Sequence, residues 1–222
     1  MPSGARPRVT LHFAQSLDGR IALGGARAFL SSRDGMALAH RARAEADAVL
    51  VGSETVKIDD PQLTVRACAG PQPLRVVLAS TLDISESARV LARTGPGLLV
   101  IGVEGRATPQ ARDRLASLGA ETCIVPPGPD GLVSLAAAVA QLHARGIARL
   151  LVEGGARVLT AFLRARLADD VTIEIAPSWL GASALAAIGS LGGAAADRSP
   201  SLTDLRVDRL GTNILVRGRV AY

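Results

Sequence analysis

Two hydrophobic patterns divide this chain: strict alternation over a few residues, and longer stretches with helical spacing. Residues 8–14 alternate, with Val9, Leu11 and Phe13 on one face, which predicts a strand. Further short runs rich in Val, Leu and Ile are each bounded by Gly, Pro or polar residues and also predict strands. They lie at residues 48–51, 75–79, 98–102, 121–125, 149–152 and 171–176.

The segments between these strands predict helices. Ser31 or Ser32 caps a helix that runs to about residue 45, and Thr108 followed by Pro109 opens another over 109–118. Two more helices are predicted at 132–145, where Gly146 ends the helix, and at 157–166. Residues 205–210 and 213–220 predict a terminal hairpin. Strands alternating with helices before a hairpin indicate an α/β fold with a mostly parallel sheet and an antiparallel edge.

The remaining segments predict loops around one folded unit. Residues 1–7 are rich in Pro, Gly and Arg and predict a flexible N-terminal tail. Residues 21–27 predict a mobile glycine-rich loop, and residues 185–201 predict a loop of small residues. Because neither a repeat nor a long linker divides the sequence, residues 8–222 are expected to form a single domain.

Composition limits the partners of this domain. The chain has 222 residues, 48% of them hydrophobic, and can bury a sizeable core. Its 25 Lys and Arg exceed its 20 Asp and Glu, but these cations are nearly all dispersed arginines and aromatic residues make up only 2%. With so few rings to stack on bases, no nucleic-acid partner is expected. Arginines that bind the phosphate of a small ligand fit this composition better.

Cysteine and histidine usage indicates a reducing compartment and no metal. Cys68 and Cys123 lie far apart without C-x-x-C spacing, so neither a disulfide framework nor a zinc site is expected. His12, His40 and His143 are scattered and are interpreted as structural strand and helix residues. Without a signal-like start or an apolar run of 18 residues, we expect a cytoplasmic protein and no membrane partner.

Polar side chains gather after the strand predicted at residues 48–51. Ser53, Thr55 and the pair Asp59–Asp60 follow it, and Arg66 ends the stretch. Ligands in open α/β sheets bind at the carboxyl ends of strands, so this stretch is a candidate site. A polar surface loop is the alternative interpretation. The adjacent carboxylates could also hold Mg²⁺, but neighbouring side chains usually point apart, and a metal is the less favoured interpretation.

A second candidate site follows the strand predicted at residues 149–152. Glu153 is followed by Gly154 and Gly155, and a helix start with free N–H groups suits a phosphate or pyrophosphate. An ordinary strand-to-helix turn would show the same glycines, but a carboxylate at the end of a core strand is costly unless it binds something. The motifs of serine hydrolases and of P-loop NTPases are absent from the sequence.

These motifs together resemble a known family. The resemblance rests on S-L-D-G-R at 16–20, R-A-E-A-D-A-V-L-V-G at 43–52, the stretch 55–66 with D-D-P-Q-L-T-V-R, V-E-G-G at 152–155 and I-A-P at 175–177. In this order they resemble the reductase domain of riboflavin biosynthesis. That family implies a dihydrofolate-reductase-like fold, an NADPH cofactor, and usually a homodimer. The H-x-E and P-C-x-x-C zinc ligands of the deaminase half of bifunctional members do not occur in this sequence, so we expect reductase activity only.

Roles are carried over by matching positions. The resemblance implies that the cofactor contacts are Thr55, Asp59, Ser80, Gly154, Gly155 and Ala156. It implies that the phosphorylated substrate is held by Arg43, Leu63, Arg66 and Glu153, with Arg43 and Arg66 converging on the phosphate. Asp59 is the best candidate for proton handling, and Glu153 is a second carboxylate at the reacting end.

The chain departs from the family pattern at a few positions. Arg27 and Phe29 stand where a small polar residue and Trp are common, Gln15 replaces a small residue, and Ala79 stands where Asp is common. Arg27 and Gln15 would face the substrate in the family layout, so they put substrate identity in question. A reductase of a dihydrofolate or pteridine, and a non-catalytic nucleotide-binding module, stay open as alternatives.

Overall fold

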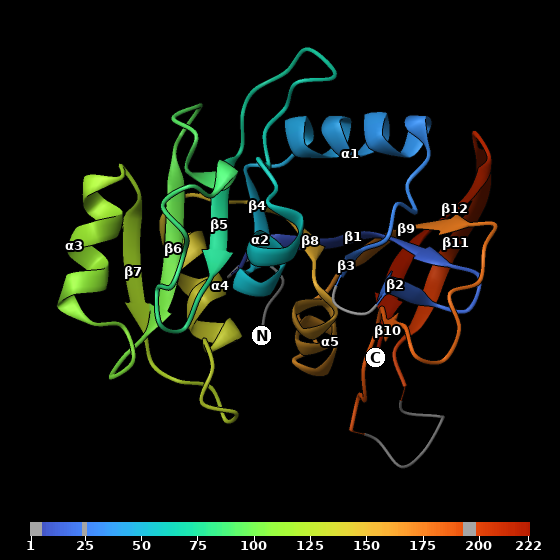
Figure 1. Cartoon of the computed structure of the whole chain (residues 1–222). Helices are drawn as coiled ribbons and strands as arrows, with labels where there is room; N and C mark the ends of the chain where they lie inside the picture. Colours follow the sequence, from blue (N-terminus) through green and yellow to red (C-terminus); the bar gives the residue numbers. More distant parts are fainter. Residues whose placement is uncertain (1–5, 24–25, 193–198) are drawn as a thin grey trace.

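The computed structural model is built on one large sheet that crosses the molecule (Figure 1). The structure describes residues 6–23, 26–192 and 199–222, and for residues 26 and 27 only the backbone. The strands of this sheet are β1 (Arg8–Ser16), β4 (Ala48–Gly52), β5 (Leu74–Leu78), β6 (Leu98–Val103), β7 (Glu121–Val125), β8 (Arg149–Gly154), β9 (Asp170–Ala176), β11 (Ser201–Leu210) and β12 (Asn213–Ala221). Their spatial order is β11-β12-β9-β1-β8-β4-β5-β6-β7.

The predicted sheet type is confirmed. Neighbouring strands from β9 to β7 pair in parallel, and β12 joins β9 antiparallel, so the terminal hairpin forms one edge. The hairpin strands are longer than predicted because β11 begins at Ser201, inside a segment that was expected to be a loop.

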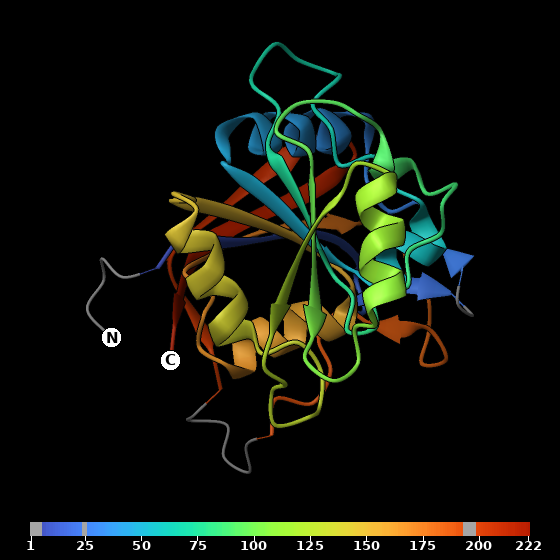
Figure 2. The same cartoon turned by 90° about the vertical axis from the view of Figure 1, so that its left-hand side faces the viewer.

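Helices cover both faces of the parallel strands. They are α1 (Arg33–Glu45), α2 (Ser53–Asp59), α3 (Pro109–Ser117), α4 (Leu135–Ala144) and α5 (Ala156–Arg164), with a short 3-10 helix at Arg89–Leu91. Figure 2 shows α3 and α4 on opposite sides of β6 and β7. The buried side chains of α4 and α5 pack against one face of the sheet, and those of α2 and α3 pack against the other.

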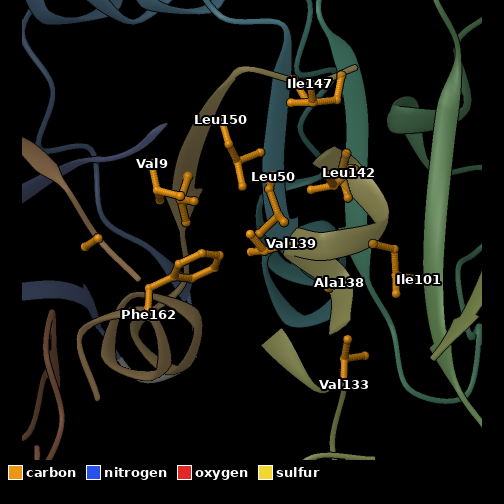
Figure 3. Packing of buried hydrophobic residues seen from close by; sticks show 14 of the residues in the cluster. Val9, Leu50, Ile101, Val133, Ala138, Val139, Leu142, Ile147, Leu150 and Phe162 are labelled. Carbon is orange, nitrogen blue, oxygen red and sulfur yellow. The ribbon is translucent and has the colours of Figure 1, made fainter. Parts of the chain in front are cut away.

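Strand alternation explains this two-layered core. Val9, Leu50 and Leu150 face α4 and α5, where they meet Val139 and Phe162 (Figure 3). Residues of opposite parity in the same strands face the other helices. Because the central strands are covered on both faces, they consist of nearly continuous apolar residues.

A second, smaller sheet was not predicted. It joins β10 (Leu185–Ala186), β2 (Arg20–Leu23) and β3 (Ala26–Arg27), which lie in segments expected to be loops. Its strands are two to four residues long, too short to show a hydrophobic period.

Two residues of the predicted N-terminal tail, Arg6 and Pro7, are held against the domain. Arg6 Nη1 and Nη2 each lie 2.7 Å from a carboxylate oxygen of Asp169, and Pro7 is buried. Residues 1–5 of the predicted tail lie outside the described residues. Among the residues that the structure describes, none of the helices combines the length and the hydropathy needed to cross a bilayer.

Candidate active site

A cavity of about 590 Å³ opens where β4 and β8 end and α2 and α5 begin. This volume lies within the usual range of small-molecule sites, and the position at strand carboxyl ends is where α/β sheets bind ligands. Most of the predicted site residues line this cavity: Arg43, Thr55, Asp59, Leu63, Arg66, Ser80, Glu153, Gly154, Gly155 and Ala156.

Two predicted positions differ from the others. Arg27 lies in β3, but its side chain falls outside the described residues. Gln15, which was expected to face the substrate, is not among the described residues that line the cavity.

The wall that follows β4 comes from α2. Thr55 and Asp59 line the cavity from this helix, whereas the neighbouring Asp60 is turned away from it. Asp60 has φ +41 and accepts a 2.7 Å hydrogen bond from the backbone N–H of Arg89. The two adjacent carboxylates therefore point apart. Ser80, which follows β5, completes this wall.

The glycine turn after β8 faces this wall. Gly154 has φ +117 and Gly155 has φ +82, conformations that favour glycine. A Cβ on Gly155 would lie 2.7 Å from Thr55 Oγ1, so the glycine turn and α2 approach too closely for a side chain. Gly155 caps α5 without a side-chain hydrogen bond, so the first N–H groups of this helix remain available. The turn thus fits a pyrophosphate.

A buried ion pair joins α1 to β8. Arg43 Nε and Nη2 lie 2.6 Å from Glu153 Oε1 and Oε2, and the side chains are only 12% and 11% exposed. Arg43 Nη1 also donates to the carbonyl of Thr64 at 3.2 Å. Burial alone would lower the pKa of Arg43, but the charge and hydrogen bonds of Glu153 outweigh it and raise the pKa. In this structure Arg43 therefore neutralises Glu153.

Arg66 is the second predicted arginine. Its backbone N–H donates to His40 Nδ1 at 3.2 Å and its Nη1 donates to Thr64 Oγ1 at 3.3 Å, but it pairs with no carboxylate within the described residues. Burial and the nearby charges of Arg43 and Arg89 lower the pKa of Arg66. This side chain is therefore held in a positive environment that an anion would relieve.

Leu63 carries backbone strain beside these arginines. It is 1% exposed and has φ +56, a region that is unfavourable for a branched side chain. Strained backbone of this kind is often found at ligand sites, where the surrounding structure maintains it.

Among the lining residues without a predicted role are two ionisable groups on strands, His12 on β1 and Glu174 on β9. His12 is 7% exposed and has no hydrogen-bond partner among the described residues. Burial lowers the pKa of His12, although the charges of Glu153 and Glu174 oppose this and that of Arg43 adds to it. The sequence signal that could have found His12 is the alternation of β1, which places His12 on the face of the strand away from Val9 and Leu11.

Comparison with known proteins identifies the family. A family model described as the RibD C-terminal domain matches residues 7–216. The chain belongs to this family. The resemblance inferred from the sequence motifs is therefore confirmed.

Relatives include whole and partial matches. The riboflavin biosynthesis protein RibD of Aquifex aeolicus is 34% identical over 95% of this chain, which spans only 57% of that protein. A 2,5-diamino-6-ribosylamino-4(3H)-pyrimidinone 5′-phosphate reductase of Methanothermobacter thermautotrophicus is 37% identical, and the match covers 79% of this chain and 80% of the relative.

Solved structures confirm the dihydrofolate-reductase-like fold. The structure of Acinetobacter baumannii RibD superposes with a TM-score of 0.86 at 28% identity, covering 99% of this chain and 60% of that one. The yeast reductase Rib7 has a TM-score of 0.76 at 23% identity, which supports the fold alone.

Proposed function

We propose that this chain is an NADPH-dependent reductase that converts a ribosylamino-pyrimidine 5′-phosphate into its ribitylamino form. The observation that carries this proposal is one cavity with a glycine cradle on one wall and the Arg66 guanidinium on another. Relatives that cover most of this chain are named as reductases of such a pyrimidine phosphate.

The cofactor residues surround the glycine cradle. The N–H groups at the start of α5, with Gly154, Gly155 and Ala156, would hold the pyrophosphate of NADPH. Thr55 and Asp59 would hold its nicotinamide end, and Ser80 its adenosine end. When bound, NADPH supplies the hydride that is added to C1′ of the ribose.

The substrate residues lie toward the C-terminal end of α1. Arg66 would bind the 5′-phosphate with Leu63 beside it, and we propose Arg27 as a further substrate contact. Glu153, held by Arg43, would accept hydrogen bonds from ribose hydroxyls. As hydride adds to C1′, the C1′–O4′ bond breaks and O4′ gains a proton. We propose that Asp59 handles this proton, with Glu153 as a second carboxylate at the reacting end.

Isotope tracing tests this reaction. With NADPH deuterated at the transferred position, mass spectrometry of the product should show one deuterium at C1′ and a net gain of two hydrogen atoms. An Asp59→Asn enzyme should turn over at least about 100-fold more slowly even with saturating NADPH, because the amide keeps a polar side chain near the nicotinamide but cannot handle the proton. A near-normal rate in this variant would remove Asp59 from the chemistry, and unlabelled product would contradict the proposed reaction.

A dihydrofolate or pteridine is the second candidate substrate. It is favoured by Glu174, because a pterin needs an acidic partner for its amino-pyrimidine edge. A non-catalytic nucleotide-binding module would bind NADPH without turnover, and the presence of Thr55, Asp59 and Glu153 in one cavity argues against it. We further propose that the protein acts in the cytoplasm as a homodimer, as its cysteine usage and family resemblance predict.

A further inference from the structure

Glu174 is a buried carboxylate that the proposed reaction does not use. It lies on β9 between β12 and β1, and only 2% of the residue is exposed. Its Oε1 accepts hydrogen bonds from the backbone N–H and the hydroxyl of Ser32, both at 2.8 Å, and from Asn213 Nδ2 at 2.7 Å. Because Asn213 also donates to the carbonyl of Leu30, this carboxylate is fixed in one orientation.

The second oxygen of Glu174 is free to accept. Oε2 receives no hydrogen bond from the described residues. In the described part of the chain, the buried side-chain nitrogen or oxygen atom that has neither solvent contact nor a hydrogen-bond partner is Arg20 Nε, and Glu174 Oε2 does not belong to this class. Oε2 is therefore not sealed off, and the surface that Glu174 reaches is the cavity. Glu174 Oε2 packs directly on α1, because a Cβ on Gly35 would lie 2.0 Å from this oxygen. The start of a helix favours a negative charge there.

Helix α1 links Glu174 to the phosphate end of the cavity. Ser32 caps its start and contacts Glu174, whereas His40, eight residues later, accepts from the backbone N–H of Arg66. At 1.5 Å per residue this separation is about 12 Å. This span is comparable with the length of a phosphoribosyl group with a pyrimidine attached. A substrate whose phosphate binds Arg66 would therefore extend its heterocycle toward Glu174.

We propose that Glu174 Oε2 accepts a hydrogen bond from the ring amino group that deamination removes, and so selects the diamino substrate over its deaminated form. This inference rests on the proposed function. The two substrates differ at one ring carbon, which carries an amino donor in the first and a carbonyl acceptor in the second. A carboxylate oxygen accepts from the amino group but repels the carbonyl, and a buried polar mismatch is strongly unfavourable.

Competition between the two substrates tests this selection. Equal concentrations of the diamino and deaminated ribosylamino-pyrimidine 5′-phosphates are given with NADPH, and both ribityl products are quantified by mass spectrometry, which yields the ratio of kcat/KM values. The wild-type protein should favour the diamino form by at least about tenfold. Glu174→Gln should lower this ratio by about tenfold, because the amide also offers a donor to the carbonyl. Asp170→Asn, on the same strand but outside the cavity, should leave the ratio unchanged.

The ratio separates recognition from folding. If Glu174 only stabilises the start of α1, its substitution slows both substrates equally and leaves the ratio unchanged, which would overturn the inference. Wild-type preference for the deaminated form would overturn it without any variant, even if Glu174→Gln does not fold. In both cases turnover of a pyrimidine would still uphold the proposed function. If neither pyrimidine is reduced, the proposed function and this inference fail together.

Discussion

At the scale of residues, the two cavity arginines have different surroundings. Arg43 is held in a bidentate ion pair by Glu153, whereas the Arg66 guanidinium donates to the hydroxyl of Thr64 and pairs with no carboxylate of the described residues. Removing one partner of a buried ion pair leaves an uncompensated charge, so Arg43 has a structural role whatever it binds. Arg66 is therefore the sharper test of phosphate recognition.

Arg66→Ala should raise the KM for the phosphorylated pyrimidine by about 10-fold to 100-fold while kcat changes little, because a charge-assisted hydrogen bond contributes about 1.5–3 kcal/mol. Steady-state NADPH oxidation measures both constants. Arg41→Ala is the matched control, since Arg41 is exposed on α1 and does not line the cavity. An unchanged KM in Arg66→Ala would show that this arginine does not bind the phosphate.

His12 should make the protein less stable in acid. Burial lowers its pKa from an ordinary value of 6.5, with Glu153, Arg43 and Glu174 as the facing charges. As the pH falls through about 6.5, the unfolded chain takes up a proton and the folded chain does not, so stability falls. Urea unfolding at pH 7.5 and 5.5 should show a larger loss for the wild type than for His12→Gln. His40 stays in both proteins, and equal losses would contradict this role of burial.

Sequence reasoning reached some of these residues and missed others for physical reasons. The glycine turn and Arg66 carry local signals, because their residue types are unusual next to a buried strand. Glu174 gave no such signal. Its importance depends on β9 lying beside β1 and on the start of α1 lying against Glu174, and the order of strands in a sheet is not encoded locally.

At the scale of elements, the β8–α5 turn is the most constrained part of the cavity. Its close approach to α2 could not be read from the sequence, since α2 has only seven residues and shows no complete hydrophobic period. The sequence predicted a phosphate or pyrophosphate site at this pair of glycines. What required the structure was that a side chain on Gly155 would meet Thr55.

Gly155→Ala should therefore affect both stability and cofactor binding. Its φ of +82 is unfavourable for alanine, at a cost of about 1–3 kcal/mol, and the added methyl group would fill the cradle. We expect NADPH affinity, measured by fluorescence titration, to fall at least about tenfold.

Gly146→Ala is the control for that substitution. Gly146 has the same φ of +82, but a Cβ there meets nothing within 4 Å and the residue does not line the cavity. It should lose stability and keep NADPH affinity. Equal affinity in both variants would contradict a cradle at Gly155.

At the scale of the whole molecule, β11 of the terminal hairpin is an edge of the main sheet that no further strand of the described residues covers. Strand β11 is exposed over most of its length, and Leu205 and Val207 are 58% and 61% exposed. Apolar side chains on an open edge strand favour association with another chain. These exposed side chains agree with the proposed homodimer. The antiparallel edge strand that carries them belongs to the hairpin that the sequence predicted.

Val207→Lys should accordingly give a monomer, because each subunit would bring a charge to the shared edge. Light scattering over a range of concentrations measures the mass. Ala116→Lys on the exposed face of α3, at the opposite end of the sheet, should leave the mass unchanged. A wild-type protein that is monomeric at all concentrations would contradict an interface at this edge.

The most direct test of the reductase function follows NADPH absorbance with purified protein. The diamino and deaminated ribosylamino-pyrimidine 5′-phosphates are supplied in separate reactions, with dihydrofolate in parallel. We expect NADPH to be oxidised with a phosphorylated pyrimidine and not with dihydrofolate. NADPH oxidation with dihydrofolate alone would agree with the fold and the cofactor but contradict the proposed substrate. NADPH binding without any turnover would contradict the proposal that this protein is an enzyme.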